Sequence, residues 1–263
     1  MNSAHPLQEH LAHLEAALAE AGALLAHHAR GDRAYRLKGH EDPVTAADHE
    51  VDALLRTRLP RAGEGWLSEE TLDDPRRLGC RRTWVVDPLD GTRDFVAGRS
   101  EYAISVGLVE DGVPVLGGVC NPGAGFTAVG GPGLGIRVQG SPALAWRECA
   151  AADVRVLTSR SEWKRGEWRR FERPGLCLLP VGSVAYKMAL VAAGLADATW
   201  TLVPKNEWDV AGGTALVRAA GGEVWRPDGG ELRFNRAHTR FPCLAAALGP
   251  AAARVRAELE RAT

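Results

Sequence analysis

The sequence predicts a mixed fold, in which helices and antiparallel strands share the first half of the chain and strands and helices alternate in the second. Two observations predict it. An amphipathic helical pattern opens the chain and precedes strand-like runs, and after residue 152 strand-like and helix-like runs alternate. The chain has 263 residues, 45% of them hydrophobic, which is enough to bury a substantial core. We expect an N-terminal α+β half, residues 1–145, and a C-terminal α/β half, residues 146–263, that together form one unit.

The first half is expected to contain two helices and five strands. Leucines recur mostly three or four residues apart between Leu7 and Ala29, which is typical of an amphipathic helix, and a second helix is expected to begin at Thr45 and end before Pro60. Runs rich in apolar and β-branched residues predict strands at residues 65–67, 83–86, 102–109, 113–120 and 125–129. Because an Asp-Gly turn joins the third and fourth strands, we expect an antiparallel meander.

The second half is expected to follow a Gly- and Pro-rich loop over residues 130–152. Its predicted strands are residues 155–158, 176–179, 198–202 and 222–225, the last of them the final strand. Its predicted helices are residues 162–171, 183–193 and 209–220, the last beginning on Asp209 as its own N-cap. This alternation is typical of an α/β arrangement.

Charge and cysteine usage exclude several classes of protein. With 32 basic and 33 acidic residues, the chain has no net attraction to nucleic acid or to an anionic membrane, and we expect the paired arginines at 76–77 and 81–82 to lie in a solvated loop. No apolar run is long enough for a membrane span, and the N-terminus lacks a signal-peptide pattern. The cysteines are odd in number and far apart, which argues against disulfides and thiolate zinc and favours a reducing cytoplasm; they are Cys80, Cys120, Cys149, Cys177 and Cys243.

Acidic residues stand at the ends of predicted elements, where side chains project into crevices. They are Asp48, Glu70, Asp87, Asp90 and Asp209. Asp87 and Asp90 flank a tight turn directly after an apolar strand, and two carboxylates so confined repel each other unless a cation lies between them. Oxygen ligands without nearby His or Cys favour Mg²⁺. The N–H groups of Gly91 and Thr92 could face an anion at the start of a helix, so the pattern indicates phosphate chemistry.

Some of these acids also have simpler explanations. Asp42 is expected to favour a helix start through the macrodipole, Asp209 could serve only as an N-cap, and Glu69 could face solvent beside Glu70. For Asp48, the spacing to Thr45 favours a catalytic role. Asp209 is counted with the metal ligands because the rest of the set accompanies it.

Four motifs resemble those of the inositol monophosphatase superfamily, in the same order and at similar spacing. They are DPVTAAD at 42–48, EET at 69–71, DPLDGT at 87–92 and WDVAG at 208–212. The resemblance spans nearly the whole chain. It implies a layered αβαβα fold, hydrolysis of a phosphate monoester, dependence on two or three Mg²⁺ ions, sensitivity to lithium and a homodimer.

The resemblance also implies which residues hold the metal ions. Glu70, Asp87 and the carbonyl of Leu89 match the positions that hold the activating ion. Asp87, Asp90 and Asp209 match the positions that hold a second ion. Two ions about 3.5–4 Å apart can activate a water and stabilise the leaving oxygen of an in-line displacement.

Catalytic and phosphate-binding roles follow from the same resemblance. Thr92 and Asp48 match the pair that orients the attacking water, and Glu70 acts with them through the first metal. Asp90 and the N–H groups of Gly91 and Thr92 match the phosphate site. The implied mechanism is direct attack by water, without a phosphoenzyme.

The substrate is left open between branches of the superfamily. Residues that resemble the bacterial branch acting on 3′-phosphoadenosine 5′-phosphate are Arg160, Ser183, Lys187 and Glu207, of which Arg160 and Lys187 could hold a second phosphate. Inositol phosphatases place an acid seven residues before the last metal Asp, and Leu202 stands there. The alternatives are an inositol-1-monophosphatase, a broad sugar phosphatase, and a metal-binding regulator without turnover, against which the intact acidic set argues.

Overall fold

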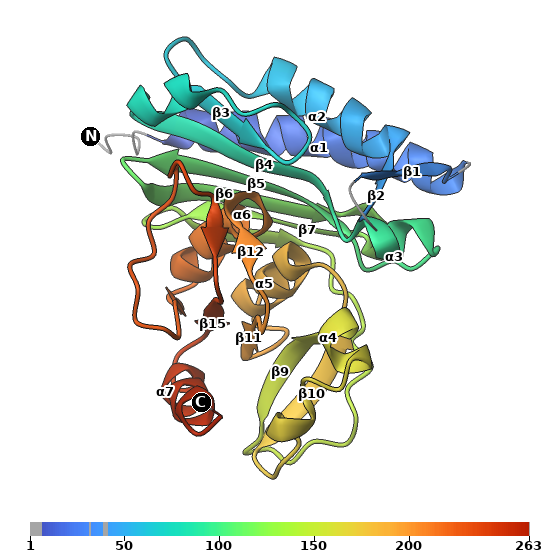
Figure 1. Ribbon diagram of the computed structural model, residues 1–263, viewed down its shortest axis with the longest axis vertical. Helices are drawn as coiled ribbons and strands as arrows, with labels where there is room; N and C mark the ends of the chain where they lie inside the picture. The colour runs from blue at the N-terminus through green and yellow to red at the C-terminus, as the bar shows by residue number, and fades with distance from the viewer. Residues whose placement is uncertain (1–6, 32, 39–41, 263) are drawn as a thin grey trace.

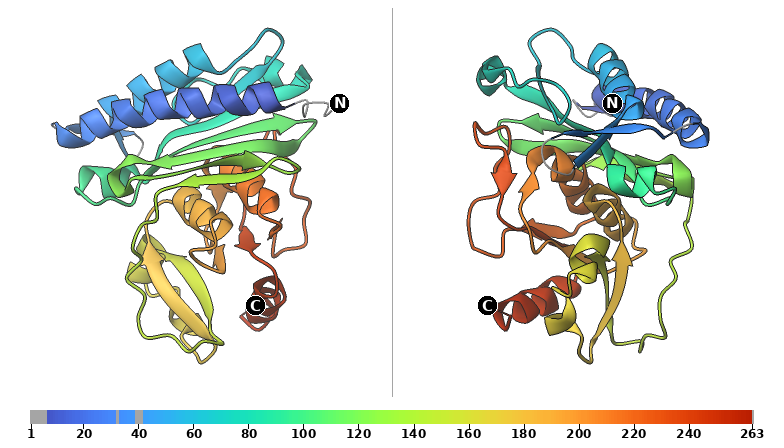
Figure 2. Two further views of the ribbon diagram at one scale, coloured as in Figure 1. Left: turned by 180° about the vertical axis from the view of Figure 1, so that it is seen from behind. Right: turned by 45° about the vertical axis from the view of Figure 1, so that its right-hand side comes forward.

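The structure is a computed structural model and describes residues 7–31, 33–38 and 42–262. Its helices and sheets form five layers, as Figure 1 and the two views of Figure 2 show. Helices α1 (Gln8–Arg30) and α2 (Ala46–Arg58) cover one face of a six-stranded sheet, and α5 (Val184–Ala192) and α6 (Glu207–Ala219) lie between this sheet and a five-stranded one. Helix α7 (Ala251–Glu260) packs against the outer sheet. The expected αβαβα fold is confirmed.

The six-stranded sheet carries the antiparallel meander that the sequence predicts. Its strands lie in chain order: β3 (Gly65–Ser68), β4 (Arg82–Asp90), β5 (Ala103–Glu110), β6 (Val113–Asn121), β7 (Phe126–Gly131) and β8 (Gly135–Gln139). All neighbours are antiparallel except β3 and β4, which run parallel. Because β3 and β4 are parallel, their C-terminal ends lie at the same end of the sheet, which brings together the acidic residues after β3 and those at the end of β4.

In the five-stranded sheet, four strands run in one direction and one runs opposite to them. Its order is β10 (Leu176–Val181), β9 (Val154–Ser159), β11 (Ala198–Trp200), β15 (Ala245–Ala247) and β13 (Glu223–Trp225), with the first three parallel. The remaining described strands form two small antiparallel pairs. In the first, β1 (Tyr35–Lys38) pairs with β2 (Asp42–Thr45), and in the second, β12 (Lys205–Asn206) pairs with β14 (Arg240–Phe241), which lies much later in the chain. The chain passes between the halves after β8, and the division at residue 145 stays a prediction.

Several predicted elements differ from the structure. The helix expected over 162–171 is split into α4 (Arg160–Lys164) and a 3₁₀ turn, because Gly166 adopts a positive φ between them. Asn206 is the N-cap of α6, and Asp209 accepts a hydrogen bond from the Asn206 N–H within a capping box. Strands β1, β2, β8, β12, β14 and β15 and helix α7 were not predicted, so the strand predicted at 222–225 is not the final one. Asp42 begins β2 instead of a helix.

Helix α6 lies unusually close to the six-stranded sheet because glycines face each other at the contact. A Cβ on Gly117 of β6 would collide with the carbonyl of Gly212, and one on Gly107 would lie 2.8 Å from the Ala211 Cβ. A sheet and helix without side chains between them have little freedom to shift. This contact fixes the first turn of α6, and with it Asp209, relative to β4.

The arginines at 76–77 do not share one environment. Arg77 is buried, and its guanidinium donates to Asp73, to the Asn235 side chain and to the carbonyl of Arg236. The expectation of a solvated loop is therefore wrong for Arg77, which ties the loop before β4 to a segment near the C-terminus. Among the described helices, none is long and apolar enough to cross a bilayer.

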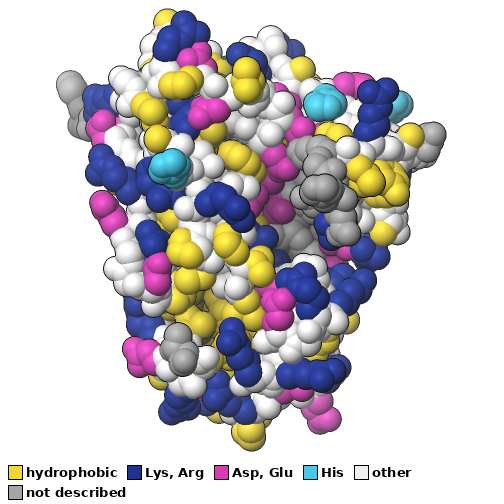
Figure 3. Space-filling view, in the orientation of Figure 1, with side chains coloured by type: hydrophobic (Ala, Val, Ile, Leu, Met, Phe, Trp, Pro, Cys, Tyr) yellow, Lys and Arg dark blue, Asp and Glu magenta, His cyan; other side chains and the backbone are white. Residues whose placement is uncertain are grey.

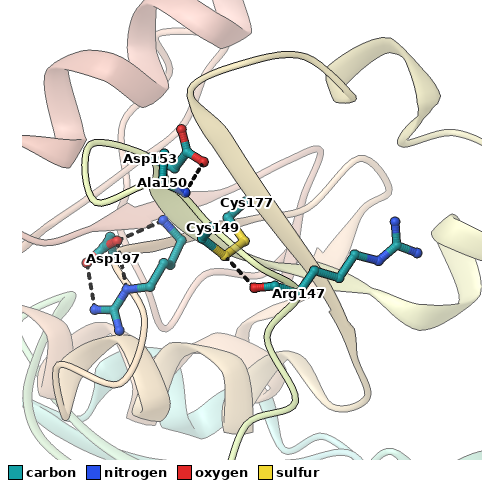
Figure 4. The surroundings of a disulfide bond; sticks show 7 residues. Arg147, Cys149, Ala150, Asp153, Cys177 and Asp197 are labelled. Carbon is teal, nitrogen blue, oxygen red and sulfur yellow. Dashed lines mark hydrogen bonds and ion pairs between the residues drawn. A yellow bond between two sulfur atoms is a disulfide. The ribbon is translucent and has the colours of Figure 1, made fainter.

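One pair of cysteines forms a disulfide, contrary to the expectation from spacing. Cys149 lies in the segment between β8 and β9 and Cys177 lies in β10, 28 residues later, with their Cα atoms 5.7 Å apart (Figure 4). The other three cysteines are unpaired. Chain spacing did not predict the pair because the folded segment, not the sequence distance, sets which thiols meet. The disulfide also removes the ground on which a reducing compartment was inferred.

We expect Cys149→Ser to lower the free energy of unfolding by about 2–4 kcal/mol, because the disulfide closes a loop of intermediate length in the unfolded chain. Urea denaturation without reductant measures this. Reductant should lower the stability of the wild type to the same level and leave the variant unchanged. Cys80→Ser, which removes an unpaired thiol, is the matched control, and equal stability of all three proteins would contradict the disulfide.

Candidate active site

Three carboxylates from separate segments meet at the edge of the six-stranded sheet. Glu69 follows β3, Asp87 lies near the end of β4, and Asp209 lies in the first turn of α6. One oxygen of each lies within 4.8 Å of the other two. The Glu69 N–H donates to the carbonyl of Val86, which continues the parallel β3–β4 pairing and places Glu69 beside Asp87.

Electrostatics in this cluster favour a bound cation. Asp87 is almost fully buried, and burial, followed by the charges of Glu69, Asp90 and Asp209, raises its pKa well above the usual range. Burial also raises the pKa of Asp209 to about 7, with Asp90 and Glu69 adding to the shift and Lys205 opposing it. Carboxylates that resist ionisation together are stabilised by a hard divalent cation, so the donor set fits Mg²⁺.

The structure corrects the choice within the Glu69–Glu70 pair. Glu69, not Glu70, belongs to the carboxylate cluster, and the Glu70 carboxylate lies 3.9 Å from Nδ1 of His49 on α2. Side chains alternate along a strand. Leu67 and Val85 face α5 and α6, whereas Trp66 packs on the α1 and α2 side.

The same alternation identifies the ligand from the sequence. Glu69 continues the Leu67 face and Glu70 continues the Trp66 face, so only Glu69 points toward Asp209. Counting in steps of two from the apolar residues of the strand would have found Glu69. Glu69 therefore takes the place of Glu70 in the carboxylate cluster, and its metal-binding role is a proposal.

Asp90 connects the end of β4, beside the carboxylate cluster, to the start of helix α5. Its Oδ2 accepts hydrogen bonds of 2.7 Å from the Ser183 hydroxyl and from the Ala185 N–H at the start of α5. Ser183 is the N-cap of this helix and has a positive φ. The charge of Asp90 is close enough to raise the pKa of both Asp87 and Asp209. Its predicted role as a ligand of a second ion stays a prediction.

Asp48 and Thr92 form a connected pair beside the cluster. The Thr92 hydroxyl lies 2.9 Å from the Leu89 carbonyl oxygen and 3.3 Å from Asp48 Oδ1. Asp48 Oδ2 accepts from both the N–H and the hydroxyl of Thr45, each at 2.7 Å, in the capping box of α2. A buried carboxylate held by two donors keeps its second oxygen in a fixed position toward Thr92.

Gly91 begins the short helix α3 (Thr92–Val96) and makes the turn after Asp90 possible. Its φ is +93°, and a Cβ there would lie 3.0 Å from the carbonyl oxygen of Glu101. Only glycine meets both conditions without strain. The turn places the Gly91 and Thr92 backbone against the cleft, as the predicted phosphate site requires.

A cleft of about 490 Å³ is lined by the three clustered carboxylates and by Asp90, Gly91 and Thr92. Figure 3 shows acidic side chains gathered in a hollow on this face, with Lys and Arg side chains along its lower side. Five acidic side chains line the cleft: Glu69, Asp87, Asp90, Asp94 and Asp209. Seven cationic ones line it: Arg93, Arg99, Arg160, Lys164, Arg165, Lys187 and Lys205. The excess of cations suits an anionic substrate.

The predicted substrate residues are distributed unevenly. Arg160, Ser183 and Lys187 line the cleft, but the Arg160 guanidinium is paired with Glu101 through both of its carboxylate oxygens. The Lys187 ammonium is buried and donates to the carbonyls of Val181 and Ser183. Burial lowers the Lys187 pKa to about 8. Both cations are thus engaged within the protein.

The structure does not support the substrate-binding position predicted for Glu207, because this residue does not line the cleft. It is fully buried and accepts hydrogen bonds from the backbone N–H groups of Asn235 and Arg236 and from the Arg236 side chain. Its neighbour Asp209 is two residues farther along α6, on a different face of the helix. Glu207 therefore anchors the segment at 235–236, and Leu202 also lies outside the cleft lining.

Comparisons with known proteins agree with the geometry. The model of the inositol monophosphatase family matches residues 7–262. An inositol-1-monophosphatase of Mycobacterium leprae (strain TN) is 35% identical over 215 residues, covering 76% of this chain and 74% of that protein. A 3′-phosphoadenosine 5′-phosphate phosphatase of the same strain is 33% identical over 205 residues, covering 75% and 74%. The extragenic suppressor protein suhB from Bartonella henselae superimposes with a TM-score of 0.77 at 25% identity, covering 95% and 98%.

We expect Glu69→Gln to weaken Mg²⁺ binding by more than about tenfold, since loss of an outer-shell partner alone costs about 10–100-fold. Isothermal calorimetry on the purified chain measures the affinity. Glu70→Gln is the matched control, because it makes the same change one residue away and should stay within about threefold of the wild type. A larger loss in Glu70→Gln than in Glu69→Gln would return the ligand to Glu70.

Mg²⁺ binding should tighten as the pH rises from about 6 to about 8, because Asp209, with a pKa of about 7, must lose its proton to bind metal. Without metal, the same raised pKa should lower the stability of the fold as the pH rises from about 4 to about 7, since the folded state keeps a proton that the unfolded chain has lost. Thermal melting with and without Mg²⁺ between about pH 4 and pH 8 measures both effects. Asp209→Asn should flatten the pH dependence of the shift, and an unchanged slope would contradict the assignment.

Proposed function

The chain belongs to the inositol monophosphatase family, and from that premise we propose that it is a Mg²⁺-dependent phosphatase that hydrolyses small phosphate monoesters by direct attack of water. The observation that carries the proposal is the cluster of Glu69, Asp87 and Asp209 beside the Asp48–Thr92 pair. A binding protein needs the cluster to hold a cation, but it has no need of the adjoining hydroxyl–carboxylate pair. The combination supports a hydrolase.

Glu69, Asp87 and the Leu89 carbonyl would hold the activating ion, and Asp87, Asp90 and Asp209 a second one. Bound Mg²⁺ supplies Lewis-acid chemistry, which lowers the pKa of a water and offsets charge on the phosphate oxygens.

The Asp48–Thr92 pair orients the attacking water. A hydroxyl has one proton and two lone pairs, so Thr92 Oγ1 can accept a hydrogen bond from water while donating to Asp48 Oδ1. Asp48 is held by Thr45 and therefore aims this acceptor along one direction. Water attacks phosphorus, the ester P–O bond breaks, and inorganic phosphate and an alcohol leave.

Asp90, Gly91 and Thr92 position the reacting phosphate. The backbone N–H groups after the positive-φ turn donate to phosphate oxygens, and Asp90 fixes the turn through its bonds to the start of α5. Because these donors are backbone groups of a rigid turn, they need no reorganisation when the substrate enters.

We take 3′-phosphoadenosine 5′-phosphate, or a related small ester with more than one anionic group, as the substrate. The relative that is 33% identical is named for that substrate, and the cleft has more cationic than acidic side chains. An inositol phosphate is the second candidate, because the relative that is 35% identical is named an inositol-1-monophosphatase. Leu202 lies outside the cleft and supplies no carboxylate for sugar hydroxyls. Cytoplasmic location, a homodimer and lithium sensitivity stay predictions.

Phosphate release from a panel of nucleoside bisphosphates, inositol phosphates and fructose 1,6-bisphosphate, with and without Mg²⁺, tests the function and ranks the substrates. The wild type should release phosphate only with Mg²⁺. Asp87→Asn should lower kcat/KM by more than about a hundredfold, because it removes a ligand in contact with both proposed ions.

The variant should remain folded, because Asp87→Asn removes a repelling charge from the metal-free cluster. Its melting temperature without metal, measured beside activity, separates loss of function from loss of fold. A Mg²⁺-stabilised wild type that hydrolyses nothing in the panel would favour the metal-binding regulator instead.

A further inference from the structure

Most cations that line the cleft are already compensated inside the protein. Arg99 is paired with Asp94, Arg160 with Glu101, and Arg165 with Glu167, whereas Lys187 is buried against two carbonyls. A guanidinium must give up an existing charge-assisted bond before it can bind a ligand. These side chains therefore shape the wall of the cleft more than they attract a second anion.

Two lysines differ from this pattern. Within the part of the chain that the structure describes, the side chains of Lys164 and Lys205 form no hydrogen bond or ion pair, yet both line the cleft. Lys164 is exposed in the last turn of α4, and Lys205 is half-buried in β12. Binding an anion at either ammonium breaks no hydrogen bond or ion pair within the described residues, and the charge of Lys205 acts on Asp209 and Lys187 only through space.

Their positions place this charge beside the reaction centre. The backbone of Lys205 is fixed by pairing with Phe241 of β14, and the charge of Lys205 reaches both Asp209 and Lys187. Lys164 lies on the short helix that also carries Arg160, at the wall opposite the metal edge formed by β3 and β4. The two lysines therefore approach the cleft from two separate segments.

We propose that Lys164 and Lys205 bind a second phosphate of the substrate, the one that is not hydrolysed. The inference rests on the proposed phosphatase function and replaces the pair expected from sequence, Arg160 and Lys187. A substrate with two phosphates would span the cleft, with the reacting group at Gly91 and Thr92 and the other between the lysines. An ester with one phosphate would leave both ammonium groups without a partner.

The test compares adenosine 3′,5′-bisphosphate with adenosine 3′-monophosphate, which differ only in the second phosphate. In Lys164→Gln and in Lys205→Gln, the ratio of kcat/KM for the bisphosphate to that for the monophosphate should fall by at least about tenfold, the effect of one lost charge-assisted bond. Lys→Arg at either position should restore most of the ratio. Added salt should lower this ratio of kcat/KM values in the wild type and leave the ratio unchanged in the double variant Lys164→Gln/Lys205→Gln.

Arg169→Gln is the matched control, since it removes one positive charge from the segment that follows α4 but lies outside the cleft. Its ratio should equal that of the wild type. An unchanged ratio in both lysine variants, or an equal fall in Arg169→Gln, would overturn the proposal. Parallel losses on both substrates would also overturn it, because the lysines would then act on the reacting phosphate or the metal ligands.

A binding measurement separates this proposal from the proposed function. Calorimetry without Mg²⁺ of adenosine 5′-monophosphate, which retains the 5′-phosphate and lacks the 3′-phosphate, should show binding at least about tenfold weaker in the double variant Lys164→Gln/Lys205→Gln than in the wild type. If the wild type hydrolyses neither nucleotide but this difference is present, the phosphatase function fails and the anion subsite stands. If hydrolysis occurs and the difference is absent, the subsite fails alone.

Discussion

The repulsion among buried carboxylates at the edge of the six-stranded sheet is the constraint on which the rest of the structure depends. Asp87 is almost fully buried, and Glu69 and Asp209 are held within a few ångströms of it. Such an arrangement costs free energy in the metal-free chain. Rigid segments must impose it: parallel pairing fixes Glu69 against Asp87, and the contact of α6 at Gly117 fixes Asp209. A looser fold would let the charges separate and lose the site.

Asp48, Asp90 and Asp209 also hold helix starts, which explains how the orientation of these carboxylates is kept. Oδ2 of Asp48 accepts the Thr45 N–H, Oδ2 of Asp209 accepts the Asn206 N–H, and Oδ2 of Asp90 accepts the Ala185 N–H. In each case one oxygen satisfies a backbone donor near a helix N-terminus, where negative charge is favoured. Each of these aspartates therefore both caps a helix start and contributes a carboxylate to the proposed active site. Asp209 is a capping-box member and a proposed ligand at once, so the two explanations weighed from sequence do not compete.

The sequence predicted most of the helices and strands and the acidic motifs from local rules, namely apolar periodicity and acids near strand ends. The layered αβαβα arrangement was implied by the resemblance to the inositol monophosphatase superfamily. Local rules failed where a role depends on distant segments. Glu207 is bound by residues 235–236 and Arg77 by the same segment, and Cys149 meets Cys177 across 28 residues. No local pattern encodes such contacts. The choice of Glu70 over Glu69 is different, because strand alternation contained the answer and was not applied to the residues after the strand.

The residues proposed to carry the chemistry and the lysines proposed to set specificity lie mostly in different halves of this molecule. The groups proposed to act on the reacting phosphate lie in the first half, on α2, after β3, at the end of β4 and at the start of α3, and Asp209 on α6 is added from the second half. Lys164 and Lys205, the cations proposed to bind the second phosphate, lie on α4 and β12 of the second half. A short helix and a two-residue strand tolerate substitution far better than a buried carboxylate cluster does. Relatives of this chain are named for an inositol phosphate and for a nucleotide. In the proposed arrangement, substitutions at the two lysine positions would change the bound group and leave the carboxylate cluster in place.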